Sequence, residues 1–135
     1  MSVAVGKLKV MASEPRAKLL QRGIRNSDQL LEAARTPDGR KVLAEQTGIA
    51  PEAILELANR ADLARIRGIG QIYADLLEQA GVDTVKELAA RVPANLHATL
   101  TAVNAEKKLA GRAPTLPDVK KWVTQAKRLR KLLEY

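Results

Sequence analysis

Apolar residues recur at intervals of three and four along most of this chain, and that period belongs to α-helices. The longest such stripe lies near the C-terminus and comprises Val119, Trp122, Val123, Ala126, Leu129, Leu132 and Leu133. The alternation of apolar and polar residues that marks a half-buried strand occurs at most in residues 3–10. The sequence therefore predicts an all-α fold.

Proline, glycine and capping residues divide this pattern into short helices. Gly23, Gly48 and Gly81 stand where helices are expected to stop, and Ser27 and Thr84 stand where helices are expected to be capped. Thr84 and Glu87 form a capping-box pattern. Val42 and Leu43 are expected on the apolar face of their helix. The expected helices cover residues 15–22, 28–34, 37–47, 51–58, 63–66, 72–80, 85–90, 93–109 and 116–133.

The composition limits the chemistry that the chain can carry. At 135 residues and 46% hydrophobic content the chain can form a single domain, and with one Trp, two Tyr and no Phe its core must be aliphatic. It has no cysteine and a single histidine, His97, which excludes disulfides, thiol nucleophiles and cysteine zinc sites. The acidic residues form no metal-ligand cluster. We therefore expect a protein without catalytic residues, metal or cofactor, and an enzymatic role only within a larger assembly.

No apolar run approaches the length of a membrane helix, and the first residues lack the layout of a secretory signal. We expect a cytoplasmic protein that does not bind membranes.

Positive charge is concentrated at the two ends of the chain. The 23 Lys and Arg residues exceed the 15 Asp and Glu residues and give a net charge of +8. Residues 1–30 carry +4 and residues 91–135 carry +7, whereas the middle of the chain is mildly acidic. An excess of this kind favours an acidic partner such as a phosphate backbone.

Two segments resemble each other. Ala17 to Ile24, followed by Ser27, Leu30 and Leu31, resembles Ala74 to Val82, followed by Thr84 and Leu88. The glycines lie 58 residues apart, with a one-residue difference in length before them. Two copies are too few for a solenoid. They indicate a duplicated hairpin unit with pseudo-two-fold packing, in which the helices of residues 37–60 are the connector.

The stretch from Leu63 to Val82 contains Gly68-Ile69-Gly70, then Ala74 and Leu77, and ends in Gly81-Val82. It resembles the helix-hairpin-helix motif over the whole length of the motif. Glycines suit a tight turn, and the amides that open a helix can hold a phosphate. The resemblance implies contact with a DNA or RNA backbone without base readout, in some cases with a monovalent cation at the Gly68–Gly70 hairpin. The candidate phosphate-binding residues are Arg65, Arg67, Gly68, Ile69, Gly70, Gln71, Ile72, Lys120, Lys121, Lys127, Arg128 and Lys131.

Several further motifs, from Thr36-Pro37-Asp38-Gly39 to Lys120-Lys121-Trp122-Val123, resemble a bacterial family of unknown function built on two helix-hairpin-helix units, over residues 8–135. The resemblance implies one tandem (SAM-like) helical domain with a basic C-terminal helix. Its expected parts are a degenerate unit at 8–35, connector helices at 36–60, an intact unit at 61–92 and C-terminal helices at 93–135. Val10 to Pro15 lacks the hairpin glycines, and Glu14 would repel a phosphate. We expect the first hairpin to be structural or to contact protein.

Three alternatives stay open. Ala44, Gly48, Ile54 and Leu57 have the spacing of a helix-turn-helix core, although Glu52 and Glu56 disfavour a phosphate-lined groove. The same helices can serve as a protein-interaction adaptor or assembly factor. Trp122 and Tyr73 can be packing residues or stacking platforms, and packing is the expectation for both. The partner is thus DNA or RNA backbone, DNA before RNA, or alternatively a protein, and the oligomeric state is open.

Overall fold

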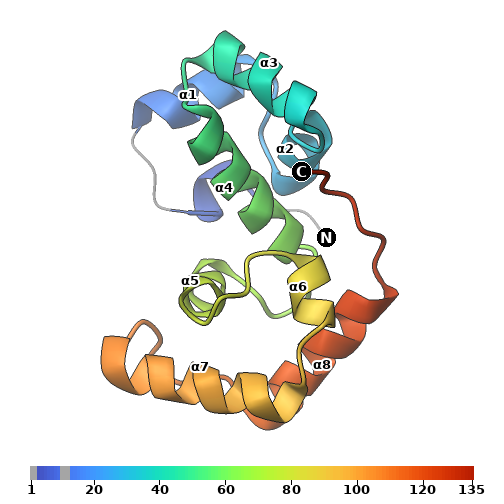
Figure 1. The fold of residues 1–135 in the computed structure, drawn as a ribbon. Coiled ribbons are helices and arrows are strands. Elements are labelled where there is room, and N and C mark those ends of the chain that lie inside the picture. Colours follow the sequence, from blue (N-terminus) through green and yellow to red (C-terminus); the bar gives the residue numbers. More distant parts are fainter. Residues whose placement is uncertain (1–2, 10–12) are drawn as a thin grey trace. The chain divides into compact units, whose positions relative to one another are not determined.

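The computed structural model describes residues 3–9 and 13–135, and apart from one isolated bridge between Ala4 and Asn26 the regular structure in them is helical. Val5–Lys7 is a short 3-10 helix, η1, so no strand forms in the described part of residues 3–10, and Val10 lies outside the described residues. The all-α prediction is confirmed. The α-helices are α1 (Ser13–Gln21), α2 (Ser27–Ala33), α3 (Pro37–Thr47), α4 (Pro51–Leu63), α5 (Gln71–Gln79), α6 (Val85–Ala89), α7 (Pro93–Lys107) and α8 (Leu116–Arg128) (Figure 1).

The helices form two compact units. Unit 1 comprises Met1–Arg65 together with Leu132–Tyr135, and unit 2 comprises Ile66–Lys131. Unit 2 is therefore inserted into the sequence of unit 1. The boundary between Arg65 and Ile66 falls within the segment 61–92, which is expected from the sequence to form one intact hairpin unit.

Both units contain four α-helices in the same packing pattern. In unit 1, α4 packs against α2 and α3, and α1 packs against α3. In unit 2, α8 packs against α6 and α7, and α5 packs against α7. The internal repeat thus extends over four helices in each unit, and α3 and α4 belong to the first copy rather than to a connector.

The register of the repeat is fixed by matching hydrogen bonds at two helix ends. The amide of Ile24 donates to the carbonyl of Leu19 at 3.0 Å, and the amide of Val82 donates to the carbonyl of Leu77 at 2.9 Å. Between them, Gly23 and Gly81 take φ values of +78° and +86°, which is the left-handed helix stop that glycine favours. Helices α1 and α5 both have nine residues and start 58 residues apart. The one-residue difference in length expected before the glycines is therefore absent.

Several helix boundaries differ from the expectation. Helix α4 runs unbroken through residues 59–62, because Arg60 and Asp62 are buried and Asp62 pairs with Arg65 instead of turning to solvent. There is consequently no separate helix at 63–66. The N-cap of α2 is Asn26, whose side chain accepts from the amide of Gln29, and not Ser27. At α6, the Thr84 hydroxyl accepts from the amide of Glu87 as expected, but the Glu87 carboxylate accepts from the amide of Asp83.

The end of the chain also departs from the helical stripe. Helix α8 ends at Arg128, and Leu129 is extended. Leu132 and Leu133 are partly buried against the core of unit 1. In α3, Val42 is 51% exposed, contrary to the expectation for its apolar face, while Leu43 and the long side chain of Arg40 are buried.

Arg40 anchors the C-terminal segment of unit 1. Its guanidinium donates to the carbonyls of Ala34 at 2.9 Å and Glu134 at 2.8 Å, and the amide of Glu134 donates to the carbonyl of Arg35 at 2.8 Å. The Tyr135 hydroxyl donates to the Asn59 side chain at 3.1 Å. These contacts hold residues 132–135 on unit 1.

Deletion of residues 132–135 is expected to lower the free energy of unfolding of unit 1 by about 2–3 kcal/mol, from lost leucine burial and from the loss of the hydrogen bonds that Glu134 makes with Arg40 and Arg35. The measurement is hydrogen exchange of the α3 and α4 amides. Tyr135→Phe, which removes only an exposed hydrogen bond, is the control and should change stability by less than about 0.5 kcal/mol. Unchanged exchange in the deletion variant would contradict the anchoring role.

Candidate functional site

The turn before α5, residues 66–70, has the geometry that the motif requires at Gly68. The amide of Ile69 donates to the carbonyl of Ile66 at 3.3 Å, and Ile69 itself is buried. Gly68 takes a φ of +93°, and a Cβ at this position would lie 3.0 Å from Nε1 of Trp122. A glycine is therefore needed for both backbone conformation and space.

Gly70 does not share this requirement. Its φ of −97° and ψ of −166° are extended values that any residue adopts, and a Cβ there would meet no atom within 4 Å. The expectation that both glycines are conformationally required is wrong for Gly70. It caps α5 without a side chain and leaves open space at the helix start, where Ile72 is 54% exposed. The first amides of a helix have no partner within the helix.

Helix α8 begins with a reciprocal capping box. The Thr115 hydroxyl accepts from the amide of Asp118 at 3.2 Å, and the Asp118 carboxylate accepts from the amide of Thr115 at 3.0 Å. Hydrogen bonds to the carboxylate from the Thr115 backbone and then from the Thr115 side chain, followed by the charges of Arg112 and Lys121, hold the pKa of Asp118 below its usual value of 3.8. The carboxylate is thus engaged at the helix start.

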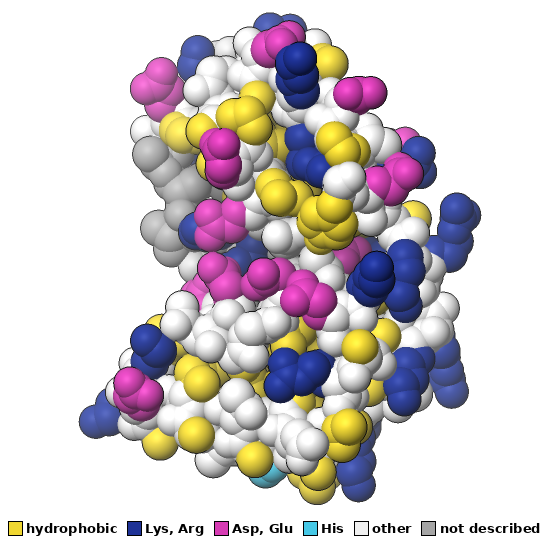
Figure 2. All heavy atoms as spheres, in the orientation of Figure 1, with side chains coloured by type: hydrophobic (Ala, Val, Ile, Leu, Met, Phe, Trp, Pro, Cys, Tyr) yellow, Lys and Arg dark blue, Asp and Glu magenta, His cyan; other side chains and the backbone are white. Residues whose placement is uncertain are grey.

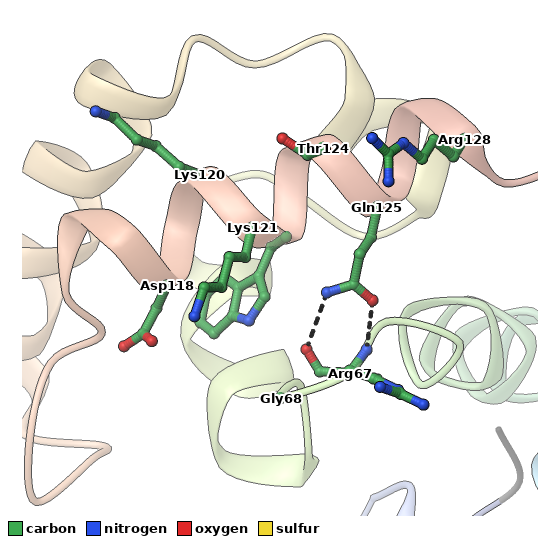
Figure 3. Close-up of a pocket in the computed structure, with 9 residues that line it drawn as sticks. Arg67, Gly68, Asp118, Lys120, Lys121, Thr124, Gln125 and Arg128 are labelled. Carbon is green, nitrogen blue, oxygen red and sulfur yellow. Dashed lines mark hydrogen bonds between the residues drawn. The ribbon is translucent and has the colours of Figure 1, made fainter.

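The buried stripe of α8 decides which of its side chains face the Gly68 turn. Val119, Trp122, Val123 and Ala126 are buried. Asp118, Lys121, Gln125 and Arg128 follow one another at intervals of three and four, so they share a neighbouring face of the helix. Figure 3 shows Lys121 and Gln125 pointing from α8 toward the turn, whereas Lys120 extends away from it.

An open pocket of about 800 Å³ lies between this helix and the turn. Four cationic side chains line it against one carboxylate, that of Asp118 (Figure 3). Lys and Arg side chains also gather on the surface around α8 (Figure 2). The lining residues are Arg67, Gly68, Asp118, Lys120, Lys121, Trp122, Thr124, Gln125 and Arg128.

Gln125 links the helix to the turn through the backbone of Arg67. The amide of Arg67 donates to Oε1 of Gln125 at 3.0 Å, and Nε2 of Gln125 donates to the carbonyl of Arg67 at 3.5 Å (Figure 3). Sequence reasoning missed this residue, since a neutral side chain 58 positions away from its partner gives no signal in charge or spacing.

The structure brings together part of the expected site. Arg67, Gly68, Lys120, Lys121 and Arg128 line the same pocket. The remaining expected residues do not line it: Ile69, Gly70, Gln71 and Ile72 continue from the turn into α5, and Lys127 and Lys131 are exposed elsewhere on unit 2.

Arg65 is engaged in another contact. Its guanidinium donates to the Asp62 carboxylate at 2.8 Å, and its side chain is only 12% exposed. We therefore leave Arg65 out of the candidate site.

The aromatic residues of unit 2 are packing residues, as expected. Trp122 is 3% exposed and lies beneath Gly68. The Tyr73 ring lies 5.4 Å from the Trp122 ring, centroid to centroid, and its hydroxyl donates to the carbonyl of Arg112 at 3.2 Å. The buried Trp122 ring offers no free face for the base stacking that single-stranded nucleic acid uses.

In unit 1, the residue that corresponds to Arg67 has its charge neutralised. The 58-residue register places Lys9 opposite Arg67 in the repeat. The buried stripe of α4, which is Ile54, Leu57, Ala58 and Ala61, has the spacing of the stripe of α8. This alignment places Glu56 opposite Lys121, and Glu56 forms an ion pair with Lys9. In unit 1 the basic residue is therefore paired with an acidic one, whereas in unit 2 the corresponding helix position adds a second positive charge.

Within the described ranges, no group of three or more acidic, histidine or cysteine side chains is arranged to hold a metal ion. None of the helices described combines the length and the apolar character that a membrane crossing requires.

A family model described as a domain of unknown function (DUF4332) matches residues 9–129. Neither the curated proteins nor the solved structures contain a match to the chain.

Gly68→Ala and Gly70→Ala form a matched pair for the turn. Gly68→Ala should lower the free energy of unfolding of unit 2 by about 2 kcal/mol, because it forces a left-handed alanine against Trp122. Gly70→Ala should change it by less than about 1 kcal/mol. Urea denaturation followed by the emission of Trp122, the only tryptophan, measures both. Equal losses of stability in the two variants would contradict the conclusion that glycine is required at Gly68 but not at Gly70.

The lowered pKa of Asp118 predicts an acid-sensitive helix start. A depressed folded-state pKa gives stability that is present above the unfolded value, near 3.8, and is lost as pH falls through the folded value. Asp118→Asn should therefore be less stable than wild type at neutral pH, with the difference shrinking toward the acid limit. Urea denaturation at a series of pH values tests this. A pH-independent difference would show that the carboxylate charge does not contribute.

Proposed function

The chain belongs to the family described as a domain of unknown function (DUF4332), and we propose that it binds the phosphate backbone of duplex DNA without reading its sequence. The observation that carries the proposal is the pocket beside the Gly68 turn, which is lined by Arg67 from the turn and by Lys121 and Arg128 from α8. Clustered Lys and Arg supply most of the affinity for a phosphate backbone. The chain carries a net charge of +8, which favours the same partner.

The contrast between the units supports a specific role for these charges. Both copies of the repeat have a basic residue before the first helix, Lys9 or Arg67. In unit 1 it is paired with Glu56, whereas in unit 2 the corresponding helix position is Lys121. Like charges gathered on one surface repel one another, and a bound anion relieves this repulsion.

The start of α5 offers a second contact for the same backbone. Gly70 follows Gly68 by two residues, so the two Cα atoms are at most about 7 Å apart. The open space at Gly70 allows a phosphate oxygen to approach the start of α5, which is the positive end of the helix dipole. A helix-hairpin-helix arrangement of the flanking helices and a cation at the turn stay predictions.

Duplex rather than single-stranded DNA is the preferred ligand because the one aromatic residue among those lining the pocket, Trp122, is buried. Tyr73 packs against Trp122, and Tyr135 is exposed but belongs to unit 1, outside the pocket. Single-strand binding relies on aromatic platforms as well as charge, whereas duplex backbone binding relies on charge and helix termini.

The experiment is fluorescence anisotropy of labelled DNA and RNA, duplex and single-stranded, over a salt series. We expect sequence-independent binding to duplex DNA that weakens steeply with salt, and weaker binding to a single strand of equal phosphate number. Absence of duplex binding at low salt would overturn the proposal. It would favour the adaptor alternative, in which the same basic face contacts an acidic protein.

Lys121→Gln and Arg128→Gln should each reduce the slope of log K against log salt by about 0.9, the value for one lost phosphate contact. Lys86→Gln is the matched control: it removes one positive charge from α6 of the same unit, outside the pocket. An equal reduction in all three variants would show that only net charge matters and that the pocket is not the interface.

A further inference from the structure

Gln125 is a neutral polar side chain that faces the Gly68 turn from the basic side of α8. It lies four residues after Lys121 and three before Arg128, so it stands between the two cations on one helix face. Its amide bonds to both backbone groups of Arg67, at 3.0 Å and 3.5 Å. From this geometry we infer that Gln125 is a positioning residue, which holds Arg67 beside Lys121 and Arg128 so that the three charges meet one phosphate backbone. The inference rests on the proposed function.

The chemistry of the contact requires a side chain of this kind. A carboxamide is both an acceptor and a donor, so it can pair with the N–H and the C=O of a single residue. Lysine and arginine can only donate, and an ionised carboxylate can only accept. The repeat alignment places Arg60 of α4 opposite Gln125, so the two-way contact cannot form at the corresponding position in unit 1.

The need to pair the backbone N–H and C=O groups of Arg67 does not by itself explain this contact. Arg67 and Gly68 are exposed, and water can bond to the same N–H and C=O groups. What the carboxamide adds is a fixed distance between the turn and α8. Trp122, three residues before Gln125 on α8, packs against Gly68, so the turn is held to α8 at two neighbouring points.

The test is a double-mutant cycle between Gln125→Leu and Arg67→Gln. Leucine is a strong helix former of similar size, and Gln125 is only half-buried, so α8 should remain intact. Circular dichroism and Trp122 emission check this. Each single variant should weaken duplex DNA binding by about tenfold at 0.1 M salt, the cost of one phosphate contact. The double variant should bind no more weakly than Arg67→Gln alone, because the two residues act as one unit.

Gln125→Leu combined with Lys120→Gln is the control cycle, since Lys120 extends away from the turn and its loss should add to that of Gln125. Exchange of the Arg67 amide hydrogen gives a readout that does not depend on DNA. It should become about five- to tenfold faster in Gln125→Leu, as expected for the loss of one hydrogen bond.

The possible outcomes distinguish the proposed function from the positioning role of Gln125. If the wild-type protein does not bind duplex DNA, the proposed function fails. If the wild type binds but Gln125→Leu leaves the affinity unchanged, or if its effect adds fully to that of Arg67→Gln, the positioning role fails and the proposed function stands. Unchanged exchange at Arg67 would equally overturn the positioning role.

Discussion

The buried stripe of one helix sets the arrangement of everything else in unit 2. Val119, Trp122, Val123 and Ala126 face the core, and the 3.6-residue period then fixes the helix face from which Lys121, Gln125 and Arg128 project. Trp122 also lies against Gly68, so the same stripe positions the turn that carries Arg67. The direction in which this helix face points is therefore a geometric consequence of core packing.

The two copies of the repeat show how one scaffold can carry different surfaces. Four helices pack in the same pattern in both units, and the glycine helix stops at Gly23 and Gly81 are matched by their hydrogen bonds. Scaffold positions are constrained by burial and by left-handed backbone, which few residue types satisfy. Surface positions are free of both constraints. Glu56 and Lys121 therefore differ in charge without disturbing the helices that carry them.

Local chemistry made much of the fold readable in advance. Pro37, Pro51 and Pro93 open helices, the three predicted stops at Gly23, Gly48 and Gly81 have positive φ, and Thr115 caps α8. The errors occur where distant contacts override local preference. The break expected between residues 58 and 63 does not occur, because Arg60 and Asp62 are buried in a continuous α4. Leu132 and Leu133 continued the stripe of α8 in sequence, yet they pack in unit 1.

The same division applies to the candidate site. The sequence alone determined the helical class, the repeat and the need for glycine at Gly68, because period, capping and backbone conformation act within a few residues. It also identified Arg67, Lys120, Lys121 and Arg128 as candidates from charge. Only the tertiary structure decided that these residues share a pocket, that Arg65 is committed to Asp62 and that Gln125 joins the turn to α8. Those contacts depend on side-chain directions in space, which packing fixes and sequence spacing does not encode.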